Sequence, residues 1–236
     1  MMQITYLSHS GFLAETETAL YLFDYYKGEV PKLDPEKQLF VLVSHGHYDH
    51  YKKEIFQLGK SPKIPYYVLP EEVEIPEEAK NNLDEAHFLR VIPGKEYCLE
   101  GRKIRTLRST DEGVAYVIQE QAGTIYHAGD LNWWHWEGEE EPFNQMMQRN
   151  YQREINKLGN MEIDLAFVPV DPRLGEQYCW GLDYFMRHTR TKHVIPMHFW
   201  GEYEIFERLE KEECTISYRE RILPLESEGQ RFVLER

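Results

Sequence analysis

The chain has 236 residues and a formal net charge of −14, because 41 acidic residues outnumber 27 lysines and arginines. Its 42% hydrophobic and 29% charged residues are typical of a globular protein, and the scattered cations argue against a general nucleic-acid-binding surface. No apolar run approaches the roughly 18–20 residues of a membrane span, and the N-terminus lacks the features of a signal peptide, so we expect a cytoplasmic protein.

The first two-thirds of the chain are dominated by strand patterns. Short runs rich in β-branched and aromatic residues predict strands over residues 3–6, 11–15, 19–23, 38–43 and 64–69. The fourth of these is a continuous apolar run, which is typical of a strand buried on both faces. An acidic, Pro-interrupted stretch then predicts a surface connection over residues 71–85. Further strands are predicted over residues 87–92, 103–108, 114–119 and 124–127.

The last third alternates helices with strands. Helices are predicted over residues 142–158, 176–188 and 203–211, and strands over 164–170, 193–197, 222–225 and 231–234. The sequence shows no internal repeat and no linker-like change in composition. We therefore expect a single domain spanning residues 1–236, with sheet inside and helices outside.

The segment HGHYDH, residues 45–50, directly follows the buried apolar strand. It concentrates four potential metal ligands within six residues: His45, His47, Asp49 and His50. Imidazole and carboxylate groups suit Zn, Fe or Mn, and ligands this close together can serve two ions. We therefore favour metal binding over a merely polar, His-rich loop.

Two later strands also end in a potential ligand. The segment YHAGD brings Asp130 after a small Gly turn, and the segment VIPMH brings His198. Strand-terminal Asp and His are common, so neither residue indicates a site alone. All of these groups nevertheless lie at strand ends followed by loops, where the sites of α/β proteins gather.

The order of these motifs resembles the metallo-β-lactamase superfamily, with HxHxDH as the specific part. The opening HSGF at residues 9–12, with YLFD at 21–24, resembles the branch that includes ascorbate-6-phosphate lactonase and related phosphodiesterases. The resemblance extends from about His9 to His198. It implies an α/β protein with an αββα four-layer sandwich, in which two central mixed sheets are flanked by helices.

The resemblance also implies one or two divalent metal ions, Zn first, with Mn or Fe as alternatives. The implied ligands are His45 and His47 for the first ion, Asp49, His50 and His198 for the second, and Asp130 as the bridge. Asp49 and Asp130 would also be catalytic, holding the metal-activated water and accepting its proton.

One ligand of the family pattern is absent. The family places a third His for the first ion shortly before the strand pair that precedes the bridging Asp, and residues 107–113 contain none. Asp111 is the candidate substitute, since a carboxylate binds the same class of metal and favours the harder Mn or Fe. The alternative is that Asp111 only caps a turn before Gly113. The first site would then be weak or empty, and we lean slightly toward this outcome.

Several neighbouring residues have two interpretations each. Asp24 ends a strand and either orients a ligand His or is an ordinary strand-end Asp. His9 either lines the pocket or lies on the surface. Trp133 and Trp134, within the aromatic segment 133–136, follow the proposed bridge. We favour a pocket wall for substrate over core packing, because four bulky side chains in a row cannot all face inward from a loop.

We expect a metal-dependent hydrolase whose activated water attacks an ester, lactone or phosphodiester-type small substrate. The substrate class follows from the resemblance alone. The alternative is a non-hydrolytic protein of the same fold, either a redox (di-iron-like) protein or a binding domain that has lost catalysis. We expect a small-molecule substrate, and neither nucleic acid nor membrane as a partner. The sequence does not indicate the oligomeric state.

Overall fold

The computed structural model describes residues 1–58 and 63–235. The chain divides into two compact units, each built on one mixed β-sheet. The first unit comprises Met1–Ile92 with Ser227–Arg236, and the second comprises Pro93–Glu226. That the whole chain acts as a single domain stays a prediction.

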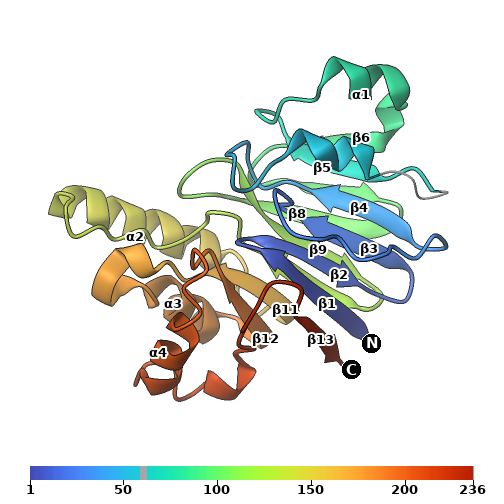
Figure 1. Ribbon diagram of the computed structural model, residues 1–236. Coiled ribbons are helices and arrows are strands. Elements are labelled where there is room, and N and C mark those ends of the chain that lie inside the picture. The colour runs from blue at the N-terminus through green and yellow to red at the C-terminus, as the bar shows by residue number, and fades with distance from the viewer. Residues whose placement is uncertain (59–62, 236) are drawn as a thin grey trace. The chain divides into compact units, whose positions relative to one another are not determined.

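In the described residues, the sheet of the first unit has seven strands in the order β13-β1-β2-β3-β4-β5-β6 (Figure 1). The strands are β1 Met2–Ser8, β2 Gly11–Glu15, β3 Ala19–Phe23, β4 Gln38–Leu42, β5 Tyr66–Pro70, β6 Phe88–Val91 and β13 Arg231–Leu234. Pairing is antiparallel from β13 to β3 and parallel from β3 to β6. The predicted apolar strand is therefore central, and its side chains from Leu39 to Leu42 are buried on both faces.

One face of this sheet packs under a short helix. Alternate residues of the central strands, such as Leu22 and Val41, form a core cluster with Ile55 of the 3₁₀ helix η1 (Lys53–Gln57). The stretch predicted as a plain connection over residues 71–85 also contains a helix, α1 (Glu77–Asn82), and a 3₁₀ turn, η2, begins at its last residue (Glu85–His87). Glu77 and Glu78 lie in the first turn of α1, where negative charge interacts favourably with the helix dipole. The acidic composition of this stretch is therefore compatible with a helix, which the sequence pattern did not predict.

The sheet of the second unit has six strands in the described residues, in the order β12-β11-β10-β9-β8-β7. The strands are β7 Glu96–Leu99, β8 Arg102–Arg108, β9 Val114–Glu120, β10 Gly123–His127, β11 Glu162–Pro169 and β12 Arg190–Met197. Strand β7 was not predicted, because its residues alternate between exposed and half-buried and lack an apolar run. It forms the edge of the sheet, where such composition is tolerated.

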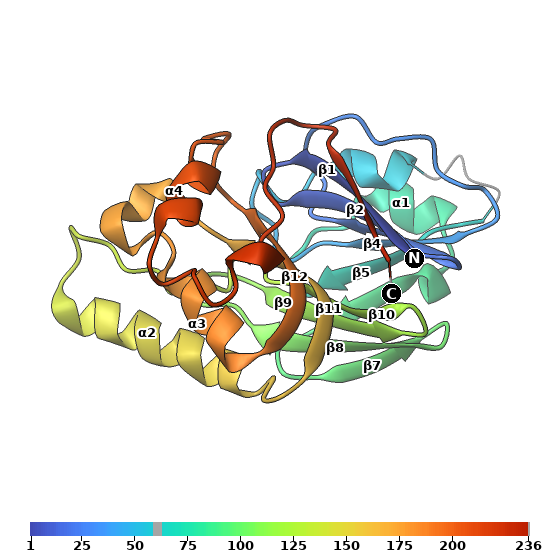
Figure 2. The ribbon, with the colours of Figure 1, turned by 90° about the horizontal axis from the view of Figure 1, so that it is seen from below.

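Helices cover part of this second sheet. They are α2 Glu141–Asn156, α3 Trp180–His188 and α4 Ile205–Lys211, with the 3₁₀ helices η3 Pro172–Gln177 and η4 Arg219–Arg221. Helix α3 contacts β11, β12 and α2 (Figure 2). It begins at Trp180, later than predicted, because residues 176 and 177 belong to the preceding 3₁₀ helix η3. The strand predicted at 222–225 is wrong: only Ile222 forms an isolated bridge, with Val194.

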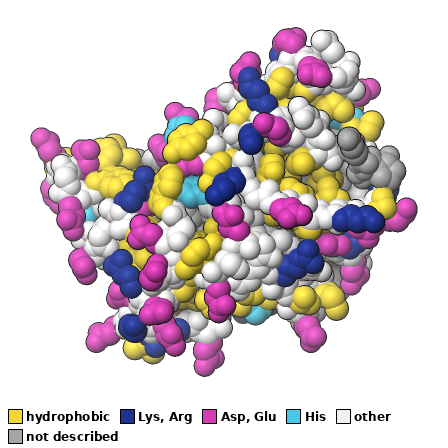
Figure 3. Space-filling view, viewed as in Figure 1, with side chains coloured by type: hydrophobic (Ala, Val, Ile, Leu, Met, Phe, Trp, Pro, Cys, Tyr) yellow, Lys and Arg dark blue, Asp and Glu magenta, His cyan; other side chains and the backbone are white. Residues whose placement is uncertain are grey.

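The molecule thus has two mixed sheets flanked by helices, which confirms the predicted α/β class. No helix in the described ranges combines the length and apolar character needed to cross a membrane. On the face seen in Figure 3, Lys and Arg side chains are interspersed among Asp and Glu. This distribution agrees with the scattered cations of the sequence.

Candidate metal centre

Three polar segments of the first unit lie at one edge of its sheet. His9 follows β1, Asp24 follows β3, and residues 44–50 follow β4. Strands β1 and β3 are both antiparallel to β2, and β3 is parallel to β4, so all three end at the same edge. The topology therefore brings the predicted HxHxDH motif beside His9 and Asp24.

His45 and His47 form a close pair within the loop after β4. The Nε2 atom of His45 lies 2.9 Å from Nδ1 of His47, and its Nδ1 atom lies 2.9 Å from the hydroxyl of Ser44. His45 is fully buried and His47 is partly buried. Two ring nitrogens at this separation can bind a single cation, as predicted for the first ion.

The Asp24 side chain holds the loop of residues 44–50 through hydrogen bonds. Its carboxylate accepts hydrogen bonds from the backbone N–H and the hydroxyl of Ser44, both at 2.6 Å. The same carboxylate lies 2.7 Å from Nδ1 of His50, and both residues are buried. A carboxylate that accepts from Nδ1 fixes a histidine ring with Nε2 available to a metal. This contact is the one expected if Asp24 orients a ligand histidine, and that role stays a prediction.

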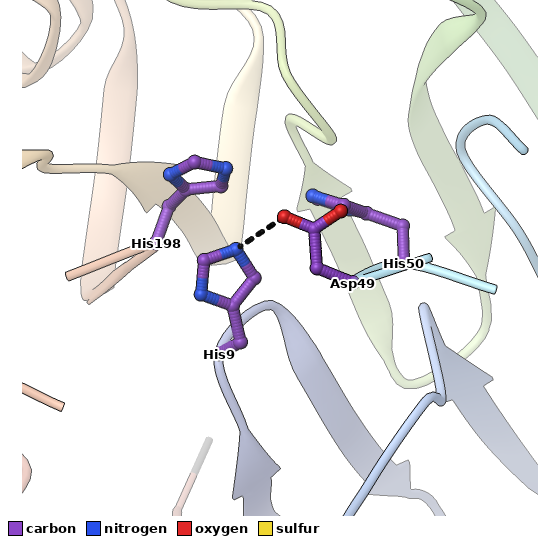
Figure 4. A group of neighbouring side chains, drawn as sticks. All are labelled: His9, Asp49, His50 and His198. Atoms are coloured by element: carbon purple, nitrogen blue, oxygen red, sulfur yellow. Dashed lines mark ion pairs between the residues drawn. The ribbon is translucent and has the colours of Figure 1, made fainter. Parts of the chain in front are cut away.

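His9 is buried beside Asp49, and not on the surface. Its Nε2 atom lies 3.5 Å from a carboxylate oxygen of Asp49, as the dashed line in Figure 4 marks. Burial by itself raises the pKa of the Asp49 carboxyl, but the hydrogen bond from His9 and the charge of His50 lower it to about 2. Asp49 is therefore ionised near neutral pH, the form that binds cations.

The second unit brings Asp130 and His198 together. Asp130 follows β10 and His198 follows β12, and the strands β10, β11 and β12 run parallel, so both residues lie at the same edge. The Nε2 atom of His198 lies 3.4 Å from a carboxylate oxygen of Asp130, and both side chains are buried. These two predicted ligands therefore meet within the second unit alone.

Asp171 is a buried residue of this group that the sequence did not single out. Its carboxylate lies 3.0 Å from Nδ1 of His198, and it accepts hydrogen bonds from Arg173 and Trp200. Burial raises the pKa of the Asp171 carboxyl, but the bonds from His198 and Arg173 lower it to about 2. A single Asp after a strand does not form a recognisable sequence motif. The one feature that could have indicated Asp171 is its position after β11, the strand that pairs with β12.

Asp111 lies close to Asp130. A carboxylate oxygen of each lies within 4.8 Å of the other. The hydroxyl of Thr110 joins the two loops, because it contacts the Asp130 carbonyl at 3.3 Å and the carbonyl and N–H of Asn132 at 2.7 and 3.0 Å. In the turn itself, Ser109 accepts the backbone N–H of Asp111. Asp111 thus lies beside the proposed bridging carboxylate of Asp130, and its role as a metal ligand stays a prediction.

The aromatic segment after Asp130 contains one buried indole. Trp134 is 6% exposed, donates from Nε1 to the Asp130 carbonyl at 3.0 Å, and lies with its ring centroid 5.6 Å from that of His198. Trp133 and Trp136 are partly exposed. The burial of Trp134 favours the core-packing alternative over our preference for a pocket wall, although its ring lies against that of His198. That Trp133 lines a substrate pocket stays a prediction.

Backbone strain gathers at these same loops. The non-glycine residues with positive φ in the described chain are His9, Asp24, Glu100, His198 and Trp200. All but Glu100 lie in the strand-end loops described above. Such conformations cost roughly 1–3 kcal/mol each and persist where the surroundings enforce them, most often at functional sites.

The donor set of each unit fits a divalent cation. In the first unit, ligand atoms of His9, Asp49 and His50 lie within 4.8 Å of one another, and so do those of His45 and His47. In the second unit, the Asp130 carboxylate lies near the imidazole of His198 and the carboxylate of Asp111. Neutral imidazole combined with carboxylate is the ligand chemistry of Zn, Mn and Fe sites.

A family model described as the beta-lactamase superfamily domain matches residues 3–143, more than half of the chain. The chain belongs to the metallo-β-lactamase superfamily. The matched residues include the HxHxDH loop and Asp130, so membership rests on the part of the chain that carries most of the predicted ligands. The specific branch with ascorbate-6-phosphate lactonase stays a prediction.

Individual proteins agree with this assignment. A UPF0173 metal-dependent hydrolase of Pyrobaculum calidifontis is 24% identical over 213 residues, which cover 84% of each chain. Igni18, a metallo hydrolase of Ignicoccus hospitalis, shares the fold with a TM-score of 0.65 at 15% identity over 99% of each chain. CmlA, a diiron β-hydroxylase of Streptomyces venezuelae, has a TM-score of 0.54 at 11% identity over 84% of this chain and 44% of its own. The two solved structures share the fold, and the Pyrobaculum relative is named a metal-dependent hydrolase. The chain therefore groups with the metal-dependent hydrolases of this superfamily.

Proposed function

We propose that this protein uses bound divalent metal, Zn in the first instance, to hydrolyse an ester, lactone or phosphodiester bond in a small molecule. The proposed ligands are those predicted from the sequence: His45, His47, Asp49, His50, Asp130 and His198. The observation that carries the proposal is that each unit gathers buried His and Asp side chains with ligand atoms a few ångströms apart. Such groups are rarely buried unless they are paired or bind metal.

The residues divide the chemistry between them. A bound divalent ion supplies a Lewis acid and lowers the pKa of water toward neutrality. Asp49, which is ionised at neutral pH, orients the attacking water and accepts its proton. Asp130 would contribute its carboxylate to both ions, in the role that the superfamily implies. Asp24 and His9 hold His50 and Asp49 in place.

We further propose that Asp111 completes the first ligand set in place of the absent histidine. Its carboxylate and that of Asp130 approach within 4.8 Å. Two carboxylates at this separation repel each other unless a cation lies between them. This geometry reverses our slight preference, drawn from the sequence, for a weak or empty first site.

A substrate panel tests the hydrolase proposal. The metal-free protein would be reconstituted separately with Zn, Mn and Fe, and each form assayed against lactones, phosphodiesters and thioesters. We expect metal-dependent turnover of at least one lactone or phosphodiester. Metal binding without turnover of any compound, by any of the three forms, would contradict the proposal.

Asp111 also favours a second candidate, a redox protein with a carboxylate-rich di-iron site. Carboxylate ligands favour iron over zinc relative to a three-histidine site. The two candidates differ in a simple measurement on the iron-loaded protein. A redox protein would change its absorbance on reduction and consume O₂, whereas a hydrolase would turn over its substrate without either change.

A further inference from the structure

We propose that Asp171 is a positioning residue that fixes the orientation and tautomer of the His198 ring, so that Nε2 is presented to a metal ion. The proposal rests on the ligand role proposed for His198. It adds a residue that lies outside the HxHxDH motif and outside the predicted ligand set.

The sheet itself places Asp171 beside His198. Strands β11 and β12 are parallel neighbours, and their last paired residues are Pro169 and Met197. The pairing continues one step further, because the N–H of Val170 donates to the carbonyl of Met197 at 2.8 Å. Asp171 follows Val170 and His198 follows Met197, so the parallel register brings the two residues close together.

The contact between the two side chains sets the tautomer. Asp171 is fully buried, and its Oδ2 atom lies 3.0 Å from Nδ1 of His198. An ionised carboxylate only accepts hydrogen bonds, so Nδ1 must carry the proton. In the neutral ring this leaves the lone pair on Nε2, the atom that lies 3.4 Å from Asp130.

Other groups keep the Asp171 carboxylate in place. Arg173 donates from Nε at 2.9 Å and from Nη2 at 2.6 Å, and its guanidinium lies 4.6 Å from the ring centroid of Trp200. The indole N–H of Trp200 donates to the same carboxylate at 3.2 Å. Both His198 and Trp200 have positive φ. Asp171 therefore holds two strained residues of one loop, and Arg173 compensates its buried charge.

The first unit contains the same arrangement. Asp24 is buried at the end of β3 and lies 2.7 Å from Nδ1 of His50. In both pairs a strand-end carboxylate contacts Nδ1 of a histidine that follows a neighbouring strand. This second occurrence, in a sheet of different topology, supports a role in ligand orientation beyond a local loop contact.

The competing explanation is that Asp171 only stabilises the start of η3, because it also accepts the backbone N–H of Arg173 at 2.9 Å. The Asp171→Asn variant separates the two roles in the full chain. An asparagine oxygen can still accept the backbone N–H, but its NH₂ group would face the donors of Arg173 or His198. Asp171→Asn therefore keeps the hydrogen bond that caps η3, whereas it loses the carboxylate that constrains the His198 ring.

The first measurement is the Zn dissociation constant, obtained by competition with a chromophoric chelator. We expect Asp171→Asn to bind Zn about 10- to 100-fold more weakly, the usual effect of losing such a partner. The matched control is Asp183→Asn, which removes another carboxylate of the second unit that is paired with an arginine, Arg187. We expect the control to bind Zn as the wild type does. Equal dissociation constants in Asp171→Asn and the wild type would overturn the proposal.

The second measurement needs neither metal nor a variant. In ¹⁵N-labelled, metal-free wild-type protein, at a pH where the ring is neutral, we expect His198 to be protonated at Nδ1. Protonation at Nε2 would overturn the proposal even if Asp171→Asn failed to fold. Neither readout involves turnover, so a protein that hydrolyses nothing would contradict the proposed function and leave this inference standing.

Discussion

At the scale of single residues, the site consists of histidines held by buried carboxylates. Asp24 contacts His50 and Asp171 contacts His198, each at Nδ1. A histidine held in this way loses little rotational freedom on binding metal, because its orientation is already set. Removing a carboxylate should therefore act on metal affinity first and on catalysis through it.

The proposed bridge is tested by Asp130→Ala. The change removes a carboxylate that lies near both His198 and Asp111, and leaves no oxygen to join two ions. We expect loss of bound metal and loss of hydrolysis together. Metal content measured by elemental analysis, with turnover on the same sample, checks this, and a fully active variant would remove the bridge assignment.

The role of Asp111 is tested by Asp111→Asn, which keeps the shape of the side chain and removes its charge. If Asp111 completes the first ligand set, the variant should retain fewer ions than the wild type after dialysis against a chelator. Asp111 is exposed, so folding should be unaffected. Equal metal content in the two proteins would show that this loop only forms a turn.

The buried indole leads to a prediction about stability. Trp134 is 6% exposed and its N–H donates to the Asp130 carbonyl. We expect Trp134→Ala to lower the free energy of unfolding by about 3–5 kcal/mol, the usual cost of removing a buried aromatic side chain. Denaturant unfolding measures this. A loss below about 1 kcal/mol, with a large change in KM, would restore the pocket-wall interpretation.

The sequence could predict the residues of the HxHxDH loop because four potential ligands within six positions are improbable unless they act together. It could not predict Asp171, since a lone Asp after a strand has no distinguishing neighbours. The partner of Asp171 lies 27 positions away, and only the register of β11 and β12 brings them together. The burial of Trp134 was not predictable for a related reason: a loop residue can be buried when its ring packs against a side chain from a distant part of the chain, here His198.

At the scale of elements, strand order determines which loops meet. Parallel pairing of β3 with β4, and of β11 with β10 and β12, places the carboxyl ends of these strands at a common edge within each sheet. Strands with apolar or β-branched runs were predictable from their patterns. The amphipathic edge strand β7 and the polar helix α1 were not, because edge and surface elements bury too little to require an apolar pattern.

The ends of α3 and α4 lead to a prediction about thiol chemistry. Cys179 immediately precedes α3, and its sulfur lies 3.9 Å from that of Cys214, which follows α4. Burial raises the pKa of both thiols, so little thiolate forms at pH 8, whereas Cys98 is exposed. We expect iodoacetamide to modify Cys98 first, and the buried pair only slowly or after unfolding. Mass spectrometry of a time course checks this, and equal rates at all three cysteines would contradict it.

At the scale of the whole molecule, the charge of −14 shapes what can approach the site. A strongly acidic protein repels nucleic acids and other polyanions at long range. A small substrate carries fewer negative charges than a polyanion, so the repulsion on it is weaker. The proposed small-molecule substrate therefore agrees with the charge. The ligand order along the chain was predictable because the superfamily pattern spans it. The substrate was not, because substrate contacts come from loops that carry no shared motif.

The most direct test of a metal-dependent hydrolase is a metal titration of the chelator-treated wild-type protein, followed by hydrolysis of a lactone or phosphodiester that the panel identifies. We predict no turnover without metal, and a rate that rises with added Zn, Mn or Fe and levels off at one or two equivalents per chain. Turnover that is unchanged by chelation and by added metal would contradict the account.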